Sequence, residues 1–513
     1  MNDRGAVVVS LDMQSRALSV AAVGMVDTAL ADLTEDLEAM SDLVSEQVEA
    51  LRRRRADIGG CASVSARVRV VVSDAIDGML SRYAAIRSDV DEVRARTVGC
   101  ADHERVADLA RRRRWLAEHV RTLQSISAGV MVAADWHSPS IGGSVVCNAG
   151  PSQVRVTANH DDYKRDRHPD QGVWEMRWLA EMVDNPHRRP LGALMTASGM
   201  AAFTTVLTHV LVEAGDGPLV VGRSLYHECR QLVHQTGRTV IEVPEEVLVE
   251  EAPPLSPAVV FVDSVCNAVG LPVTDVAGLI RRLADSDVLL VVDNTALSVA
   301  SQPWRWITGS RRLRLIVFES LTKHAQLGLD RAAGGVIVAS AAETERLDQL
   351  REHLGTNVAD VVVHQHPTPN RARLERRLGR IGRNATLIAE RLSRRAAVKG
   401  RRVRIDHPGL GSHPGGAMFA DAEFRGGCIS VAPHDDPVGF SRRFIRTALD
   451  LAAQRGVAMC EGTSFGLDTT RAYLTAATSI HSTPFLRIAA GTEDRLAIEA
   501  VAAVLDDALE IVG

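Results

Sequence analysis

Apolar residues recur at steps of three and four along the first quarter of the chain. Such spacing puts them on one face of a helix, so each run predicts an amphipathic helix. The runs span 26–51, 72–93 and 106–126, and the segments DIGGCAS and TVGCAD separate them. The pattern predicts an all-α domain over residues 1–135, built as a three-helix bundle or a coiled-coil-like hairpin.

From about residue 190 short apolar runs rich in branched residues alternate with amphipathic segments. The runs are PLVVG, TVIEV, AVVFVDS, VLLVVDN, LRLIVFES and GGVIVAS. They predict an α/β domain over residues 191–370, with a mostly parallel sheet covered on both faces. Ligands of such sheets bind beyond the carboxyl ends of the strands, where Ser264, Asp293 and Lys323 fall. Residues 136–190 are predicted to form an arm that precedes this domain.

The last part of the chain predicts a long helix followed by a small α+β domain over residues 371–513. Its expected strands are RRVRIDH, GGAMFADAEF and FLRIAAG, and EDRLAIEAVAAVLDDALEIV is expected to form a closing helix. The uncharged stretch Leu191–Val212 is long enough to span a membrane. It contains Ser, Thr, Gly and His209, so we interpret it as a buried helix instead.

Composition indicates a soluble globular protein, with 46% hydrophobic and 24% charged residues and a net charge of −5. Arginine runs at 52–55 and 111–114 invite a nucleic-acid role. However, residues 1–140 hold 18 Arg against 21 Asp and Glu, so solvated helix faces are favoured. We expect the helical domain to pack against another subunit or a partner. Seven cysteines without a C-x-x-C pair, and no visible secretory signal, favour a cytoplasmic protein.

Lysine is rare in this chain, which has only Lys164, Lys323 and Lys399 among 59 basic residues. Unlike arginine, a buried lysine can lose its proton and attack a carbonyl group. Lys323 lies in ESLTKH, after an apolar strand and before a glycine-rich turn. It is therefore a candidate Schiff-base lysine, with a salt-bridging loop lysine as the alternative.

Four segments, TASGMAAF, VDSVCNAVG, VVDNT and ESLTKH, resemble in order and spacing the cystathionine γ-synthase-like family. These are pyridoxal-phosphate (PLP) enzymes of cysteine and methionine metabolism. The resemblance covers residues 152–513 and implies PLP as cofactor and the PLP-dependent transferase fold of type I. It leaves the helical N-terminal domain unexplained.

The resemblance also implies roles for individual residues. Lys323 would hold the cofactor aldehyde and move substrate protons, and Tyr226 in GRSLYHECR would stack on the ring and assist the leaving group. Asp293, otherwise a helix cap, would pair with the ring nitrogen. The remaining expected cofactor-binding residues are Ser198, Gly199, Met200, Asn267, Thr295, Ser320 and Thr322, together with Tyr163 and Arg165, which would reach a neighbouring subunit's cofactor.

Arg487 and Ser464 would bind the substrate, Arg487 by pairing with its carboxylate; a surface ion pair is the alternative for this arginine. The sequence departs from the family pattern at Glu319, His324, His168 and Asp170, which suggests a changed substrate preference. Several histidines, including His407 and His413, lack Cys or carboxylate partners at ligand spacing, so no metal site is expected.

The expected reaction is γ-replacement or γ-elimination on a small γ-substituted amino acid, carried out by a homo-oligomer that binds neither nucleic acid nor membrane. A β-eliminating C–S lyase such as a cystathionine β-lyase would use the same residues. The third possibility is a regulatory or scaffold protein that binds PLP and has altered catalysis.

Overall fold

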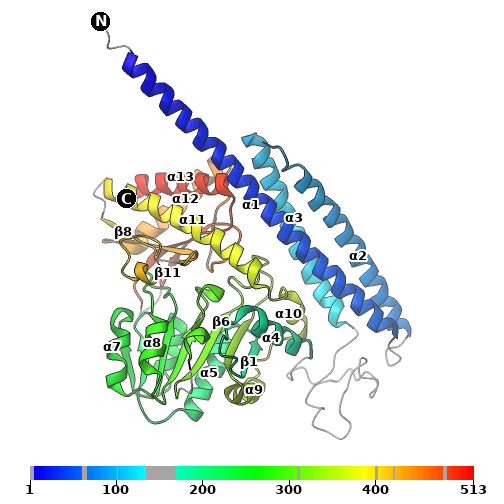
Figure 1. Cartoon of the computed structure of the whole chain (residues 1–513), viewed down its shortest axis with the longest axis vertical. Coiled ribbons are helices and arrows are strands. Elements are labelled where there is room, and N and C mark those ends of the chain that lie inside the picture. The colour runs from blue at the N-terminus through cyan, green and yellow to red at the C-terminus, as the bar shows by residue number, and fades with distance from the viewer. Residues whose placement is uncertain are drawn as a thin grey trace.

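The structure, a computed structural model, describes residues 5–60, 66–100, 102–133, 169–308, 312–398, 402–419, 422–477 and 482–513. A helical bundle lies along one side of an α/β body, and a smaller sheet with its helices lies at one end of that body (Figure 1). This arrangement confirms the predicted fold class. The division at residues 136, 191 and 371 stays a prediction.

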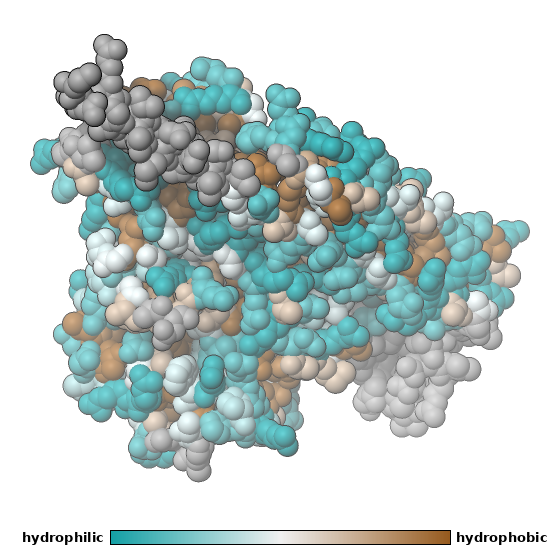
Figure 2. Space-filling view, turned by 45° about the horizontal axis from the view of Figure 1, so that its top comes forward, coloured by the Kyte–Doolittle hydropathy of each residue, from teal (hydrophilic) through white to brown (hydrophobic). Residues whose placement is uncertain are grey.

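Three long helices form the bundle: α1 (Gly5–Gly60), α2 (Ala66–Ala95) and α3 (His103–Val132). Their apolar stripes meet in one core, in which Leu37, Leu51, Ile76 and Tyr83 are fully buried. The Tyr83 hydroxyl lies 3.0 Å from the Ser127 hydroxyl, so its polar end is satisfied inside the core. Figure 2 shows hydrophilic residues over most of the visible face, with scattered hydrophobic patches.

The body is built on a seven-stranded sheet in the order β1-β7-β6-β5-β4-β2-β3. β7 runs antiparallel to both of its neighbours, and the other neighbouring pairs are parallel. Alternate residues of β4 pack into two different clusters, Val260 and Val262 on one face and Val259 and Phe261 on the other, so the sheet is buried on both faces. The strands are β1 (Leu191–Thr196), β2 (Leu219–Gly222), β3 (Val240–Val243), β4 (Val259–Asp263), β5 (Leu289–Asp293), β6 (Arg314–Ser320) and β7 (Gly335–Ser340).

Helices cover both faces of this sheet and connect it to the smaller one (Figure 1). The α-helices are α4 (Pro169–Met182), α5 (Gly199–Glu213), α6 (His227–His234), α7 (Leu248–Glu251), α8 (Val276–Leu283), α9 (Ala341–Leu354), α10 (Asp360–Gln365) and α11 (Arg371–Val398). Short 3₁₀ turns occupy Glu245–Val247, Pro253–Leu255, Ser298–Ala300, Pro303–Trp306 and Pro414–Phe419.

The smaller sheet has the order β10-β11-β12-β9-β8 and shares its core with α11 and two further helices. Its strands are β8 (Val403–Asp406), β9 (Cys428–Pro433), β10 (Cys460–Glu461), β11 (Arg471–Thr475) and β12 (Phe485–Ala489). The helices are α12 (Pro437–Arg455) and α13 (Arg495–Val512), and α13 is the predicted closing helix.

Two predictions of local structure were wrong. Leu191–Val212 is not one buried helix but strand β1 followed by α5, because Ser198 is extended and its side chain accepts the Ala201 N–H as a helix cap. GGAMFADAEF is not a strand, because Pro414–Phe419 forms a 3₁₀ turn and Phe419 and Phe424 pack into the core of the body. No helix among the described residues is long and apolar enough to cross a membrane.

The arginine runs are only partly solvated. Arg53 and Arg111 are exposed, but Arg54 is buried and the side chain of Arg113 is only 11% exposed, so the interpretation as solvated faces was wrong for these two. Arg113 lies 2.8 Å from Asp36 and also contacts Asp468 of the body. The bundle therefore packs against the body of its own chain, and packing against another subunit or a partner stays a prediction.

Ile76→Ala in α2 is expected to lower the free energy of unfolding of the bundle by about 2–5 kcal/mol, because it leaves a cavity in a fully buried position. Urea unfolding followed by circular dichroism measures this. Val71→Ala, on the exposed face of the same helix, is the matched control and should change little. Equal effects of the two substitutions would contradict the assigned core.

Candidate active site

The candidate site lies at the carboxyl ends of β4, β5 and β6. Asp263 and Asp293 end neighbouring strands and are register partners, and Ser320 ends β6. Lys323 follows in the turn after β6. The sheet topology thus brings the strand-end residues together at one edge, as expected for ligand binding in parallel sheets.

Lys323 is half-buried and its amine points at a loop of the smaller domain. Its Nζ donates a hydrogen bond to the Ser464 hydroxyl at 2.9 Å and lies 5.5 Å from the centre of the Phe465 ring. Burial, followed by the nearby Arg487 cation, lowers the pKa of Lys323. A lowered pKa favours the neutral amine, the form that acts as nucleophile or base.

Arg487, on β12, is connected to Lys323 through Ser464. Its Nη1 donates to Asn267 Oδ1 at 2.9 Å and its Nη2 to the Ser464 carbonyl at 3.3 Å. Its Nε is buried and has no hydrogen-bond partner within the described part of the chain. Lys323, Ser464, Arg487 and Asn267 therefore form one connected group, with a guanidinium donor left for a carboxylate.

Asp293, at the end of β5, is half-buried. Its Oδ1 accepts the Thr295 backbone N–H at 2.9 Å. Burial raises the pKa of Asp293, whereas the Thr295 hydrogen bonds and the Lys323 cation lower it. Because its charged form is costly to bury, a cationic group beside this carboxylate would stabilise it.

Hydroxyl groups and a helix N-terminus gather next to Asp293. The Ser320 N–H donates to Thr295 Oγ1 at 2.9 Å, and the hydroxyls of Ser320 and Thr322 lie 2.8 Å apart. A Cβ on Gly199, the first residue of α5, would lie 2.6 Å from Ser320 Cβ, so glycine permits this close approach. Backbone N–H groups and hydroxyls in this arrangement suit a phosphate.

The other predicted cofactor residues lie around the same edge. Met200 Sδ is 3.9 Å from Cys229 Sγ of α6. Tyr226 immediately precedes α6, and its backbone N–H donates to Asp263 Oδ2 at 2.8 Å. Burial, and then Glu228, raises the pKa of the Tyr226 phenol, which therefore keeps its proton. Tyr163 and Arg165 lie outside the described residues.

Sequence reasoning missed two residues of the site. Asp263 ends β4 with the same apolar-strand-then-Asp pattern as Asp293 ends β5, and this repeated pattern was a usable signal. Phe465 packs beneath both Lys323 and Arg487, whose Cζ lies 5.9 Å from the ring centre. An isolated phenylalanine in a loop gives no comparable signal in the sequence.

The residues that depart from the family pattern have separate surroundings. His324 packs between the Phe424 and Phe465 rings, and burial lowers its pKa to about 3. Glu319 lines a small cavity of about 30 Å³ with Trp304, and burial raises its pKa to about 8. Asp170 pairs with His364 at 3.0 Å, and His168 lies outside the described residues.

Glu319→Gln is expected to stabilise the protein progressively as pH rises toward 8. Folded Glu319 keeps its proton up to a pKa of about 8, whereas unfolding lets it ionise near its ordinary pKa. The wild-type free energy of unfolding therefore falls between these two pKa values and then levels off. Urea unfolding across this interval measures the effect, with the exposed Glu250→Gln as control. A wild-type and a Glu319→Gln profile that run parallel would contradict the prediction.

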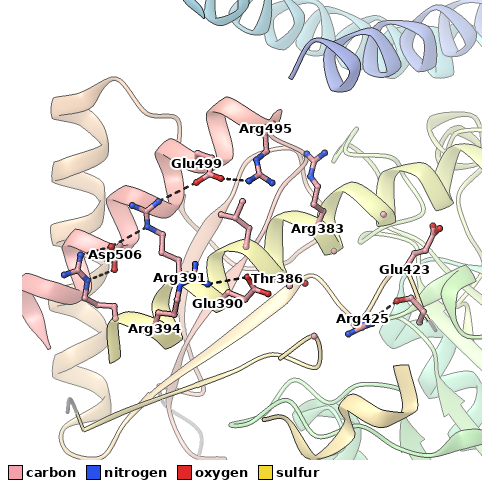
Figure 3. Close-up of a pocket in the computed structure, with 16 residues that line it drawn as sticks. Arg383, Thr386, Glu390, Arg391, Arg394, Glu423, Arg425, Arg495, Glu499 and Asp506 are labelled. Atoms are coloured by element: carbon pink, nitrogen blue, oxygen red, sulfur yellow. Dashed lines mark hydrogen bonds and ion pairs between the residues drawn. The ribbon is translucent and has the colours of Figure 1, made fainter. Parts of the chain in front are cut away.

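A groove of about 870 Å³ between α11 and α13 is a separate feature, and it contains none of these site residues (Figure 3). Its arginines are already paired, Arg391 with Glu499 and Asp506, and Arg495 with Glu499. Internal pairing of this kind leaves little charge for a ligand.

Comparison with known proteins places these residues in a family. A family model described as Cys/Met metabolism PLP-dependent enzyme matches residues 147–440. The bifunctional enzyme flvA of Aspergillus flavus is 28% identical over 347 residues, which are 65% of this chain and 41% of that protein. The chain thus spans less than half the length of this curated relative.

Solved structures share the fold at low sequence identity. A cystathionine gamma synthase from Xanthomonas oryzae pv. oryzae, in complex with cystathionine, is 23% identical with a TM-score of 0.56 over 70% of this chain and 90% of that chain. For MetB from Corynebacterium glutamicum the values are 21%, 0.55, 77% and 98%. For a methionine gamma lyase from Micromonospora echinospora they are 22%, 0.54, 71% and 92%.

The residues present fit PLP. Lys323 offers an amine of lowered pKa to an aldehyde, and Asp293 offers a half-buried carboxylate to a protonated ring nitrogen. The start of α5 and the Ser320 and Thr322 hydroxyls offer donors to a phosphate. The buried Ser264 hydroxyl and Asp263 Oδ1 have no hydrogen-bond partner among the described residues, so polar capacity remains at this edge.

Proposed function

Since the chain belongs to the Cys/Met metabolism PLP-dependent enzymes, we propose that it catalyses replacement or elimination at the γ-carbon of an amino acid with an activated oxygen or sulfur substituent. The observation that carries the proposal is the Lys323 amine, which is half-buried, has a lowered pKa and is hydrogen-bonded to the loop that also contacts Arg487. A base next to a carboxylate-binding arginine suits an α-amino acid substrate.

PLP, when bound, supplies an electron sink that acidifies the C–H bonds of an amino acid. In the proposed reaction Arg487 holds the substrate carboxylate and thereby orients the Cα–H bond toward the lysine. Lys323 Nζ then carries protons from Cα and Cβ, with Ser464 Oγ as its hydrogen-bond acceptor. Tyr226, which keeps its phenolic proton, donates it to the departing γ-group.

γ-Chemistry is preferred because two of the similar solved structures are a cystathionine gamma synthase and a methionine gamma lyase. Product analysis tests it: the PLP-loaded enzyme is incubated with O-acyl homoserines, with and without a thiol, and separately with cystathionine. A thioether or 2-oxobutanoate from the homoserine esters supports the proposal. Pyruvate and homocysteine from cystathionine would instead assign a β-eliminating lyase. Homo-oligomer formation and a cytoplasmic location stay predictions.

Arg487→Gln is expected to raise KM for the amino-acid substrate by about tenfold or more, because it removes a charge-assisted pair to the carboxylate. Steady-state kinetics measure this, and PLP absorbance should show that cofactor binding is retained. Arg404→Gln, at an exposed arginine of β8 that pairs with Asp406, is the control. An unchanged KM in Arg487→Gln would contradict the assigned role.

A further inference from the structure

Several charged side chains join the N-terminal bundle to the body. Arginines along α11 face acids along α1: Arg383 donates two hydrogen bonds to Asp32 at 2.9 and 2.8 Å, and Arg380 Nη1 lies 2.5 Å from Asp36. Figure 3 shows Arg383 pointing from α11 toward the bundle. Arg380 is only 4% exposed, so these pairs are largely shielded from water and costly to break singly.

One contact of the bundle reaches the loop that carries Ser464 of the candidate active site. Arg113 and Arg121 of α3 donate to Asp468 Oδ2 at 3.3 and 2.6 Å, and Arg377 of α11 lies 2.7 Å from the other carboxylate oxygen. Burial opposes the charge of Asp468, but the three arginines hold its pKa well below the usual value. The carboxylate is therefore ionised and held from two domains at once.

Asp468 belongs to the loop between β10 and β11, which is the loop that carries Ser464. Arg377 also donates to the Gly466 carbonyl at 2.9 Å. The same charged cluster therefore holds the loop at a second point, between Ser464 and Asp468. Ser464 accepts hydrogen bonds from Lys323 and from Arg487. The position of Asp468 thus bears directly on the two side chains that define the candidate site.

Two glycines bring the lysine segment against this loop. Gly466 has φ 78°, and a Cβ there would lie 2.9 Å from the Lys323 carbonyl carbon. Gly328 has φ 77°, and a Cβ there would collide with Asp468 Oδ1 and lie 2.5 Å from Arg377 Nη2. Since both positive φ values favour glycine, the two segments are built to pack without side chains between them.

We propose that the N-terminal bundle positions the loop 462–468 of its own chain, with Arg113 and Arg121 acting as positioning residues through Asp468. The family match begins at residue 147, so the bundle lies outside the matched part of the chain. Its role is to hold Ser464, and through it Lys323 and Arg487, in the geometry that the site requires. The consequence for catalysis rests on the proposed function, whereas the consequence for the loop does not.

Hydrogen exchange on the full chain loaded with PLP tests the contact itself. In Arg113→Gln/Arg121→Gln the amides of 462–470 are expected to exchange at least about tenfold faster. Arg112→Gln is the matched control, because Arg112 pairs with Asp108 on the exposed side of α3. Arg383→Gln removes a contact between the bundle and the body, with Asp32, that does not involve Asp468. It should leave the exchange rate of the loop amides unchanged. Loop exchange that stays at the wild-type rate in the double variant, or that rises equally in Arg383→Gln, would overturn the proposal.

Steady-state kinetics give the second readout. Because Arg487 is held by the Ser464 carbonyl, a loosened loop should raise KM for the amino-acid substrate more than it lowers kcat. PLP absorbance should remain that of the wild type. A proportional fall in kcat alone would indicate general loss of folded enzyme and contradict positioning. A wild-type protein without cofactor absorbance would overturn the proposed function, and the exchange result would still decide the role of the bundle.

Discussion

Lys323→Ala is expected to lower kcat/KM by at least about 10³-fold, because it removes both the group that anchors the cofactor and the base that moves substrate protons. The visible absorption of lysine-bound PLP should also disappear, since Lys323 is the one lysine among the residues that the structure describes. Kinetics and an absorption spectrum of the same preparation measure the two effects together.

Ser464→Ala is the informative comparison for this prediction. It removes the oxygen to which Nζ donates and leaves the amine in place, so a loss of about tenfold is expected, with the absorption band retained. Lys323→Ala with the same band as the wild type, or with activity within tenfold of it, would exclude Lys323 as the cofactor-binding residue.

The hydrophobic pattern predicted the body of the fold because its strands are buried on both faces. AVVFVDS and VLLVVDN are almost wholly apolar and contain β4 and β5. The segments in which apolar residues recur at steps of three and four form α1, α2 and α3. The prediction failed at Leu191–Val212, where strand and helix are both buried and polarity does not mark the turn at Ser198. It failed again at GGAMFADAEF, where apolar residues serve a 3₁₀ turn.

The candidate site could be predicted in part, because strand-end residues keep their order in a parallel sheet. The ends of apolar runs indicated Asp293 and Lys323, whereas the roles of Ser320 and Thr322 were implied by the family resemblance. Contacts between distant segments left no such mark: nothing in the sequence couples Arg113 to Asp468, although the structure joins them. An arginine in the sequence could pair with any of many acidic residues. The charge count therefore shows that the charges balance but does not show which residues pair.

Asp293→Asn is expected to lower kcat by about 10²–10³-fold, the usual cost of removing one preorganised electrostatic group from an active site. The amide has the same shape and can still accept the Thr295 N–H, but it carries no charge to stabilise a protonated ring nitrogen. PLP should therefore still bind through Lys323, with an altered spectrum and a weakened electron sink. Kinetics and cofactor titration on one preparation separate these two consequences.

Asp275→Asn provides the control, because Asp275 caps α8 through the Gly278 N–H and lies outside the candidate site. It should lower the free energy of unfolding only slightly, because one helix cap is weakened, and leave kcat unchanged. The contrast matters because Asp293 could equally be a helix cap by its position after a strand. Equal kcat in the Asp293→Asn variant and the Asp275→Asn control would assign Asp293 that structural role, whereas a large loss confined to Asp293→Asn assigns its charge to the chemistry.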